Sequence, residues 1–253
     1  MNEHIQPILE LLRTAGGLIM DVYRTDEADM QVEWKADLSP LTLADRRSHD
    51  FVCEKLNRLD ASIPVMSEES TQIPYSERSK WRRYWCLDPL DGTKEFINRN
   101  DQFTINLALM EGDCPVLGFI HVPVSGQTYW ALQGEGAYCH DGAVNSVISA
   151  NRKHSDWIAL ASNSHGSDDE HEVLSEFPVT KIAKVGSALK FCHIASGMAD
   201  VYFRSGPTME WDTAAGHILV EEAGAKFRYM TDAAKNYNKE SLVNPSFLVH
   251  IQR

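Results

Sequence analysis

The stretch Tyr84-Trp-Cys-Leu-Asp-Pro-Leu-Asp-Gly-Thr93 joins a hydrophobic run to a turn that carries two carboxylates. Its hydrophobic half predicts a β-strand that runs into a loop containing Asp88 and, three residues later, Asp91. Pro89 fixes the backbone and Gly92 permits a tight turn. Two carboxylates that are forced together repel each other unless a cation separates them. Oxygen ligands of this kind suit Mg²⁺, although an Asx-rich turn followed by a helix N-cap uses the same residues.

Outward from this stretch, the first half of the chain mixes helical and β patterns. Apolar spacing predicts helices at 3–23 and 42–59, a short strand at 63–66, and hairpin strands at 103–110, 116–122 and 128–132. In the second helix we expect Phe51, Val52, Leu56 and Leu59 to face inward. Gly16 and Gly17 interrupt the first helix and predict a closely packed neighbour there.

The second half of the chain alternates strands with helices. The pattern predicts strands at 157–162, 181–185 and 199–203 and helices at 168–176, 187–196 and 213–223. The sequence therefore predicts a layered α/β protein, with an α+β unit at 1–150 and an α/β unit at 151–253 that closes the site.

Composition excludes several classes of protein. The 253 residues contain 24 Lys+Arg and 36 Asp+Glu, a formal net charge of −12, so a nucleic-acid polymer is an unfavourable partner. No apolar run approaches the ~20 residues that span a bilayer. The N-terminus lacks a signal pattern, so we expect a cytoplasmic protein. The five Cys, at 53, 86, 114, 139 and 192, form no CxxC pair, which argues against a disulfide framework and a zinc-cysteine site.

Two further acidic clusters lie at the ends of predicted elements. Glu68 and Glu69 follow a predicted strand, and Asp212 precedes the helix predicted at 213–223. Taken alone, the glutamates are typical of a solvated loop and the aspartate of a helix N-cap. Together with the Asp88 and Asp91 pair, the three clusters predict two or three Mg²⁺ ions that bind a phosphate and activate water.

Motif spacing argues against other hydrolases. Asp88 and Asp91 are three residues apart, whereas the nucleophile motif of haloacid-dehalogenase-type phosphatases spaces its two aspartates by two. Direct attack by water is therefore favoured over a covalent aspartyl-phosphate. The chain contains no GxSxG, HExxH or GxxxxGK[ST] motif, which excludes the serine-hydrolase, zincin and P-loop readings.

Three motifs together resemble the inositol monophosphatase superfamily, a group of Mg²⁺-dependent, lithium-sensitive phosphatases. Asp88-Pro-Leu-Asp-Gly-Thr93 and Glu210-Trp-Asp-Thr-Ala-Ala-Gly216 resemble its two signature motifs, and Val65-Met-Ser-Glu-Glu-Ser70 its third ligand segment. The motifs occur in the expected order, and the resemblance runs from the first helix to about Gly224. It implies a layered αβαβα sandwich.

Within this superfamily, the chain is similar to the bacterial 3′(2′),5′-bisphosphate nucleotidases. The similarity rests on 92–96 and 98–106, on 186–190 and on 204–208. Lys94 stands where inositol phosphatases have a second Thr. The implied reaction is removal of the 3′-phosphate from adenosine 3′,5′-bisphosphate, giving AMP and phosphate, with 3′-phosphoadenylyl sulfate as a further substrate. The implied role is clearance of a by-product of sulfate assimilation.

The resemblance also implies roles for individual residues. The metal ligands would be Glu68, Asp88, the carbonyl of Leu90, Asp91 and Asp212. Asp45 and Thr93 would orient and deprotonate the attacking water, although Asp45 by itself is typical of a capping box. Substrate would be bound by Glu68, Leu90, Asp91, Gly92, Thr93, Ser187, Lys190, Arg204 and Asp212. Of these, Ser187, Lys190 and Arg204 would hold the nucleotide and its second phosphate, though an N-cap and two solvated basic side chains are the simpler interpretation.

Several alternatives stay open at this stage. The first is an inositol or sugar phosphatase, and the second is a non-catalytic, metal-dependent regulator that kept the acidic cluster. The oligomeric state is a monomer or a homodimer. The resemblance adds peripheral association with the inner membrane, for which the sequence contains no amphipathic basic helix.

Overall fold

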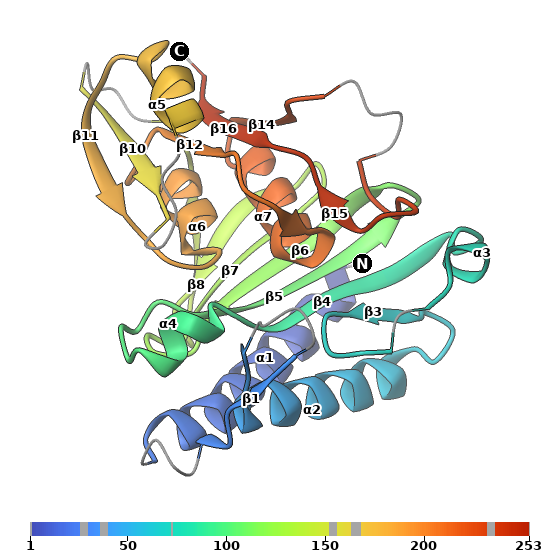
Figure 1. Ribbon diagram of the computed structural model, residues 1–253. Coiled ribbons are helices and arrows are strands. Elements are labelled where there is room, and N and C mark those ends of the chain that lie inside the picture. Colours follow the sequence, from blue (N-terminus) through green and yellow to red (C-terminus); the bar gives the residue numbers. More distant parts are fainter. Residues whose placement is uncertain are drawn as a thin grey trace.

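The computed structural model describes residues 2–25, 30–35, 40–71, 73–151, 156–162, 168–231 and 236–252. They form five alternating layers (Figure 1). Helices α1 (Asn2–Tyr23) and α2 (Leu43–Leu59) cover one face of a seven-stranded sheet. Helices α6 (Leu189–Ala195) and α7 (Glu210–Glu222) separate it from a five-stranded sheet, and α5 (Asp168–Ser175) lies on the outside. The predicted αβαβα sandwich is confirmed.

The seven-stranded sheet contains the strand that ends in the Asp88 motif. Its order is β3 (Val65–Ser67), β4 (Arg83–Asp91), β5 (Thr104–Glu111), β6 (Cys114–Val122), β7 (Gln127–Leu132), β8 (Gly136–His140) and β9 (Asn145–Ile148). Strands β3 and β4 are parallel, and all later neighbours are antiparallel. The predicted hairpins are therefore confirmed.

The five-stranded sheet includes two strands that the sequence patterns missed. Its order is β11 (Val179–Lys184), β10 (Trp157–Ala161), β12 (Val201–Arg204), β16 (Phe247–Ile251) and β14 (Ala225–Tyr229). The first three are parallel, as strand–helix alternation predicts, and β16 and β14 extend the sheet antiparallel. Two short pairs complete the β structure: β1 (Glu33–Trp34) with β2 (Pro40–Leu41), and β13 (Thr208–Met209) with β15 (Val243–Asn244).

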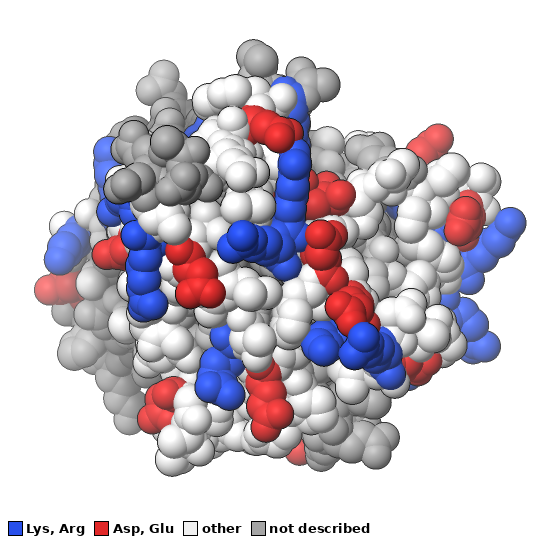
Figure 2. Space-filling view, turned by 90° about the horizontal axis from the view of Figure 1, so that it is seen from below, with Lys and Arg blue, Asp and Glu red and all other residues white. Residues whose placement is uncertain are grey.

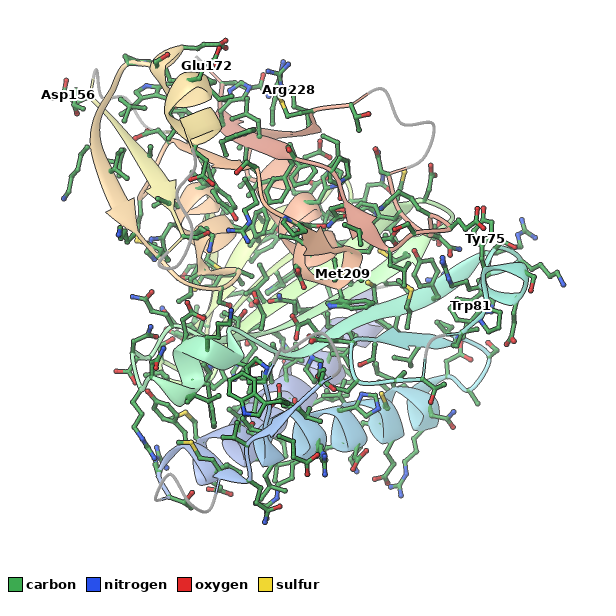
Figure 3. All side chains as sticks on the ribbon, in the orientation of Figure 1. Tyr75, Trp81, Asp156, Glu172, Met209 and Arg228 are labelled. Atoms are coloured by element: carbon green, nitrogen blue, oxygen red, sulfur yellow. The ribbon has the colours of Figure 1, made fainter. Side chains whose placement is uncertain are left out.

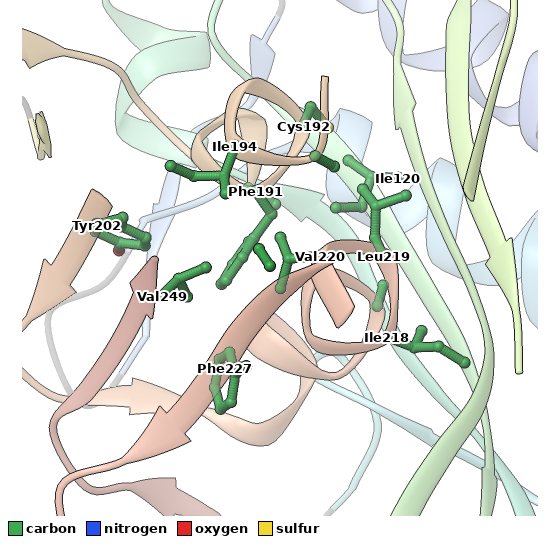
Figure 4. Packing of buried hydrophobic residues seen from close by; sticks show 14 of the residues in the cluster. Ile120, Phe191, Cys192, Ile194, Tyr202, Ile218, Leu219, Val220, Phe227 and Val249 are labelled. Atoms are coloured by element: carbon green, nitrogen blue, oxygen red, sulfur yellow. The ribbon is translucent and has the colours of Figure 1, made fainter. Parts of the chain in front are cut away.

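Two apolar cores hold the layers together. One lies between the seven-stranded sheet and the pair α1 and α2, and the other between that sheet and the C-terminal layers. Figure 4 shows the second core, where Ile120 from the first predicted unit lies in one cluster with Leu219 from the second. At Gly216 a Cβ would collide with the ring of Phe191, so glycine lets α6 and α7 approach closely. This core contains residues from both predicted units, 1–150 and 151–253. The division of the chain into two units at residue 150 therefore remains a proposal.

Three predicted boundaries are wrong, and each concerns the site. Strand β4 continues through Asp91, so the two aspartates lie in an irregular strand and not in a loop after it. Helix α7 begins at Glu210, which makes Asp212 its third residue and not its N-cap. Helix α6 begins at Leu189, and Ser187, with φ of 54°, lies outside it.

Two further expectations about packing are corrected. Val52 and Leu56 are buried as predicted, but Leu59, at the last position of α2, is 41% exposed. Gly16 does meet a close neighbour, because a Cβ there would collide with the ring of His121. Gly17 faces open space, so close packing does not explain it.

The surface carries acidic and basic side chains side by side. On the face seen from below in Figure 2, Lys and Arg are interspersed with Asp and Glu and form no continuous basic tract among the described residues. Among the described helices, none has the length and apolar character needed to cross a membrane.

Candidate active site

The site begins where the pairing of β4 with β5 becomes irregular. Asp88 lies opposite Asn106 and Asp91 opposite Thr104, with a shift of register between the two pairs. Asp88 is 1% exposed, and its Oδ1 accepts the backbone N–H of Leu90 at 3.1 Å. The irregularity therefore turns the strand around Asp88 and leaves both carboxylates close to the sheet edge where Glu68 also lies.

Asp91 is tied to the loop that precedes α6. Its Oδ2 accepts the hydroxyl of Ser187 at 2.8 Å, the N–H of Ala188 at 2.6 Å and the amide of Asn106 at 3.2 Å. Ser187 is thereby brought beside the β4 motif from 96 residues away. Gly92 has φ of 88°, and a Cβ there would lie 2.9 Å from the carbonyl oxygen of Gln102. Only glycine fits this turn without strain.

Glu68 and Glu69 follow β3, the parallel neighbour of β4. Both accept the ammonium of Lys35, Glu68 at 2.8 Å and Glu69 at 2.6 Å. Lys35 was not predicted as a site residue, because a lone lysine between β1 and β2 carries no local signal. The solvated-loop interpretation of the two glutamates is wrong, since both are partly buried and paired.

Asp212 faces the same cluster from α7. As the third residue of this helix it accepts the N–H of Met209 at 2.8 Å through Oδ2. In Figure 3, Met209 lies between the two sheets. Burial and the nearby charge of Asp91 raise the pKa of Asp212 well above its ordinary value. The pKa of Asp88 is also raised well above its ordinary value, first by burial and then by the charges of Glu68 and Asp91. Burial likewise raises the pKa of Glu68.

Three of the four carboxyl groups in this cluster, Glu68, Asp88 and Asp212, have raised pKa values because they are buried and lie near other carboxylates. In the described part of the chain, Lys35 is the one cation that forms a salt bridge with any of the four. Their oxygen chemistry fits a hard divalent cation. Among the described residues, no three Asp, Glu, His or Cys side chains converge closely enough to form a metal site as they stand. Glu68 is engaged by Lys35, and Asp91 by its hydrogen-bond donors.

A second acid–hydroxyl pair adjoins this cluster. Thr93, the first residue of α4 (Thr93–Ile97), places its hydroxyl 3.3 Å from Asp45 Oδ1 and 3.3 Å from the carbonyl oxygen of Leu90. The other oxygen of Asp45 accepts the N–H of Thr42 at 2.7 Å, so the capping-box prediction is confirmed. Burial raises the pKa of Asp45 to about 7. An acid with this pKa can take up a proton near neutral pH.

A cavity opens beside Asp91 and Asp212. Its wall includes Lys94, Glu95, Ser187, Lys190, Tyr202 and Arg204. Lys190 is not solvated, because it is 5% exposed and donates to the carbonyls of Val185 at 3.1 Å and Ser187 at 2.8 Å. Burial lowers its pKa to about 8.

Arg204 is a second basic side chain in the wall of this cavity. Its Nη1 donates to the hydroxyl of Ser162 at 2.9 Å, while its buried Nε has no hydrogen-bond partner among the described residues. Tyr202 was missed by sequence reasoning, because an aromatic residue in a strand is typical of a core. Its ring lies 5.3 Å from the Lys190 ammonium. Lys94, which departs from the inositol phosphatase pattern, is an exposed cation in the cavity wall.

Comparisons with known proteins agree with this geometry. A model of the inositol monophosphatase family matches residues 1–251. The chain is 40% identical to the 3′(2′),5′-bisphosphate nucleotidase CysQ of Salmonella typhimurium, over 98% of this chain and 99% of that one. It is 39% identical to the protein of that name in Escherichia coli, with the same coverage. The crystal structure of CysQ from Bacteroides thetaiotaomicron, described as a bacterial member of this family, superposes with a TM-score of 0.82 at 37% identity, covering 98% of both chains.

Proposed function

Since this chain belongs to the inositol monophosphatase family, we propose that it is a 3′(2′),5′-bisphosphate nucleotidase that removes the 3′-phosphate from adenosine 3′,5′-bisphosphate, giving AMP and phosphate. A second substrate is 3′-phosphoadenylyl sulfate, which carries the same 3′-phosphate. The observation that supports this substrate is a cavity whose wall contains Asp91 and Asp212 of the acidic cluster together with the basic residues Lys190 and Arg204. A substrate with two anionic groups needs a metal site for one and a local cation for the other.

We assign the metal to oxygen donors from both halves of the chain. Two or three Mg²⁺ ions would be held by Glu68, Asp88, the carbonyl of Leu90, Asp91 and Asp212. Bound Mg²⁺ supplies positive charge to the phosphate oxygens and lowers the pKa of water. The raised pKa values of Glu68, Asp88 and Asp212 support this assignment, since a cation relieves the repulsion that causes part of them.

Thr93 and Asp45 then act on the attacking water. The Thr93 hydroxyl donates to Asp45 Oδ1, so its lone pairs are free to accept a hydrogen bond from water and fix its direction of attack. As the water oxygen bonds to phosphorus, its proton passes through the Thr93 hydroxyl to Asp45. The bond from phosphorus to the 3′-oxygen breaks, and that oxygen keeps the electron pair and takes a proton from solvent.

The second phosphate is assigned to the basic end of the cavity. Arg204 lines this cavity and brings a guanidinium charge to it, so an anionic group bound there would lie next to a cation. Lys190 lies in the cavity wall with its ammonium bonded to two backbone carbonyls, so it contributes positive charge and holds the loop of Ser187 in place. Ser187, Gly92 and Asp91 also line this cavity.

The decisive experiment compares substrates in parallel. Phosphate release is measured from adenosine 3′,5′-bisphosphate, 3′-AMP, inositol 1-phosphate and fructose 1,6-bisphosphate, with and without Mg²⁺. We expect Mg²⁺-dependent release with the highest kcat/KM for the adenosine bisphosphate. Release without Mg²⁺, or a preference for inositol 1-phosphate, would refute the proposal. No release from any substrate would favour the non-catalytic regulator.

Variants then test how the second phosphate is held. A charged hydrogen bond is worth roughly 1.5–3 kcal/mol, or about 10- to 150-fold in kcat/KM. Arg204→Gln should lower the ratio of kcat/KM for adenosine 3′,5′-bisphosphate to that for 3′-AMP by this factor. Lys190→Met should lower the ratio less and should also reduce stability, because its hydrogen bonds are structural. An unchanged ratio in both variants would leave the metal cluster intact and remove the case for a bisphosphate substrate.

A further inference from the structure

Glu210 is a buried carboxylate that the proposed mechanism does not use. It is the first residue of α7 and lies two positions before Asp212. Its side chain is 0% exposed, yet it is well satisfied by donors from the chain near the C-terminus. Oε1 accepts the Lys239 ammonium at 2.7 Å and the Lys239 N–H at 3.0 Å, and Oε2 accepts the Asn238 N–H at 2.7 Å. Such an ion pair is costly to bury, so its position calls for an explanation.

The same segment holds the residue that starts α7. The backbone N–H of Glu210 donates to the carbonyl of Leu242 at 3.0 Å. The amide of Asn244 donates to the carbonyl of Met209 at 2.7 Å and to the hydroxyl of Thr213 at 2.9 Å. Residues 236–244, which we call the C-terminal bracket, therefore fix the first turn of α7 on both sides of Asp212.

The C-terminal bracket also bonds to Arg78, which lines one cavity together with Glu68. The guanidinium of Arg78 donates to Asn238 Oδ1 at 2.8 Å and to the carbonyl of Glu240 at 2.7 Å. In return, the amide of Asn238 donates to the carbonyl of Arg78 at 2.8 Å. Arg78 ends α3 (Tyr75–Arg78), which follows the segment of Glu68, and Figure 3 shows Tyr75 of this helix at the edge of the molecule. Buried hydrogen bonds thus connect the start of α7 to the segment after β3.

We propose that Glu210 is a positioning residue for metal binding, acting through the C-terminal bracket to hold Asp212 at a fixed place relative to Glu68. Asp212 uses Oδ2 for the Met209 N–H, so the direction of its other oxygen depends on where Met209 and the first turn of α7 lie. The hydrogen bonds to Glu210 and Asn238 set that position. The proposal rests on the proposed function, in which Asp212 and Glu68 bind Mg²⁺.

The test is the variant Glu210→Gln, which keeps the shape of the side chain and removes its charge. Loss of a supporting interaction typically costs 10- to 100-fold in metal affinity or activity. We expect the Mg²⁺ concentration for half-maximal activity to rise by roughly 10-fold or more, with kcat at saturating Mg²⁺ near the wild-type value. The Mg²⁺-dependent rise in Tm, measured without substrate, should move to higher Mg²⁺ by the same factor. A purely structural role would lower Tm at every Mg²⁺ concentration and leave this midpoint unchanged.

Helix α7 offers a matched control at its other end. Glu222, its last residue, also accepts backbone N–H groups, from Gly134 at 2.9 Å and Gly136 at 3.0 Å. Glu222→Gln should lower Tm without moving either Mg²⁺ midpoint. If Glu210→Gln matches Glu222→Gln in both midpoints, the inference is wrong.

A second variant covers the case in which Glu210→Gln does not fold. Asn238 has φ of 52°, so Asn238→Gly keeps the backbone conformation and removes the hydrogen bonds to Arg78. It should raise both Mg²⁺ midpoints, and unchanged midpoints would overturn the inference. Asp212→Asn distinguishes a failure of the metal assignment from a failure of the role proposed for Glu210. If wild type shows no Mg²⁺-dependent rise in Tm, or if Asp212→Asn keeps it, the metal assignment itself fails. If wild type shows the rise, Asp212→Asn loses it and Glu210→Gln keeps the wild-type midpoint, only the role of Glu210 fails.

Discussion

Helices α2 and α7 each carry in their first turn an aspartate of the candidate site, but the residues that fix that turn differ between the two helices. In each helix the third residue is an aspartate that accepts the N–H of the N-cap residue, Thr42 at 2.7 Å for Asp45 and Met209 at 2.8 Å for Asp212. In α2 the N-cap is itself polar, and its hydroxyl accepts the N–H of Ala44 at 3.2 Å and donates to Asp45 at 2.5 Å. In α7 the N-cap is a methionine, and Asn244 fixes its carbonyl.

The two aspartates therefore differ in how they are positioned, Asp45 by neighbours in sequence and Asp212 by tertiary contacts. Asp45 is oriented by residues within three positions of it, so its geometry is encoded in one short stretch of sequence. Asp212 also accepts an N–H from three positions away, but Met209 and Glu210, which precede it, are bonded by Asn244 and Asn238, some thirty positions further along the chain. In both cases one oxygen secures the helix and leaves the other for the site, where Asp45 meets Thr93 and Asp212 joins the acidic cluster.

The largest expected effect on activity comes from removing the charge of Asp212, the carboxylate that tertiary contacts position. Asp212→Asn should lower kcat/KM for adenosine 3′,5′-bisphosphate by more than the roughly 100-fold that loss of a supporting side chain costs. Tm in EDTA should stay equal or rise, because the variant removes a buried carboxylate that repels its neighbours. Phosphate-release kinetics and thermal unfolding in EDTA measure the two effects. Near-wild-type turnover at saturating Mg²⁺ would contradict the assignment of Asp212 as a ligand.

The locally positioned pair should show a somewhat smaller effect on kcat. Thr93→Ala should lower kcat by about 100-fold or more with little change in KM, because a hydroxyl that orients water acts mainly in the transition state. Asp45→Asn should behave alike. The double variant should be little worse than either single one, since the two residues form one unit. Losses that multiply fully would show that Thr93 and Asp45 act independently.

The sequence predicts the parts of the site that neighbouring residues position, and it does not predict the parts that tertiary contacts position. The β4 motif, the capping box at Asp45 and the hairpins depend on nearest neighbours and on alternation, so they were predicted from the residues. The start of α7 was placed three residues late, because Met209 gives no capping signal and the strand β15 that fixes it lies far along the chain. Lys35, Asn238 and Glu210 were missed for the same reason, since only the folded chain brings their partners to them.

The pH dependence of stability provides a third test, on Asp45 alone. Its pKa is about 7 in the folded chain, against an ordinary value of 3.8. Between these values the folded state keeps a proton that the unfolded state has lost, so the free energy of unfolding falls as pH rises from about 4 to about 7. Asp45→Asn removes this term, worth roughly 1.4 kcal/mol per pH unit in that window. In EDTA, Tm of the variant minus Tm of wild type should therefore be several degrees larger at pH 8 than at pH 5.

A matched control for this pH effect comes from a carboxylate with the opposite shift. Asp141 is exposed, and the N–H groups of Val144 and Ala143 lower its pKa. Asp141→Asn should therefore be less stable than wild type by an amount that stays constant between pH 5 and pH 8, and that shrinks only as pH falls from the ordinary pKa of 3.8 through the lowered one. A difference between Asp45→Asn and wild type that does not change with pH would show that Asp45 is ionised in the folded, metal-free chain.

The smallest expected effect concerns Lys35, the cation that Glu68 already binds. A metal ion at Glu68 competes with this ammonium, so Lys35→Met should make Mg²⁺ binding easier. A partly exposed ion pair is worth about 0.2–1 kcal/mol, which corresponds to a fall of up to about fivefold in the Mg²⁺ concentration for half-maximal activity. Arg58→Met is the control, because it removes the same charge from a surface pair with Glu54 on α2. If Lys35→Met raises the Mg²⁺ requirement, Lys35 supports the metal site; if both variants lower it equally, the effect is only one of net charge. A selective fall in Lys35→Met would show that the glutamate half of the site, like the Asp212 half, is set by a residue that no local sequence pattern reveals.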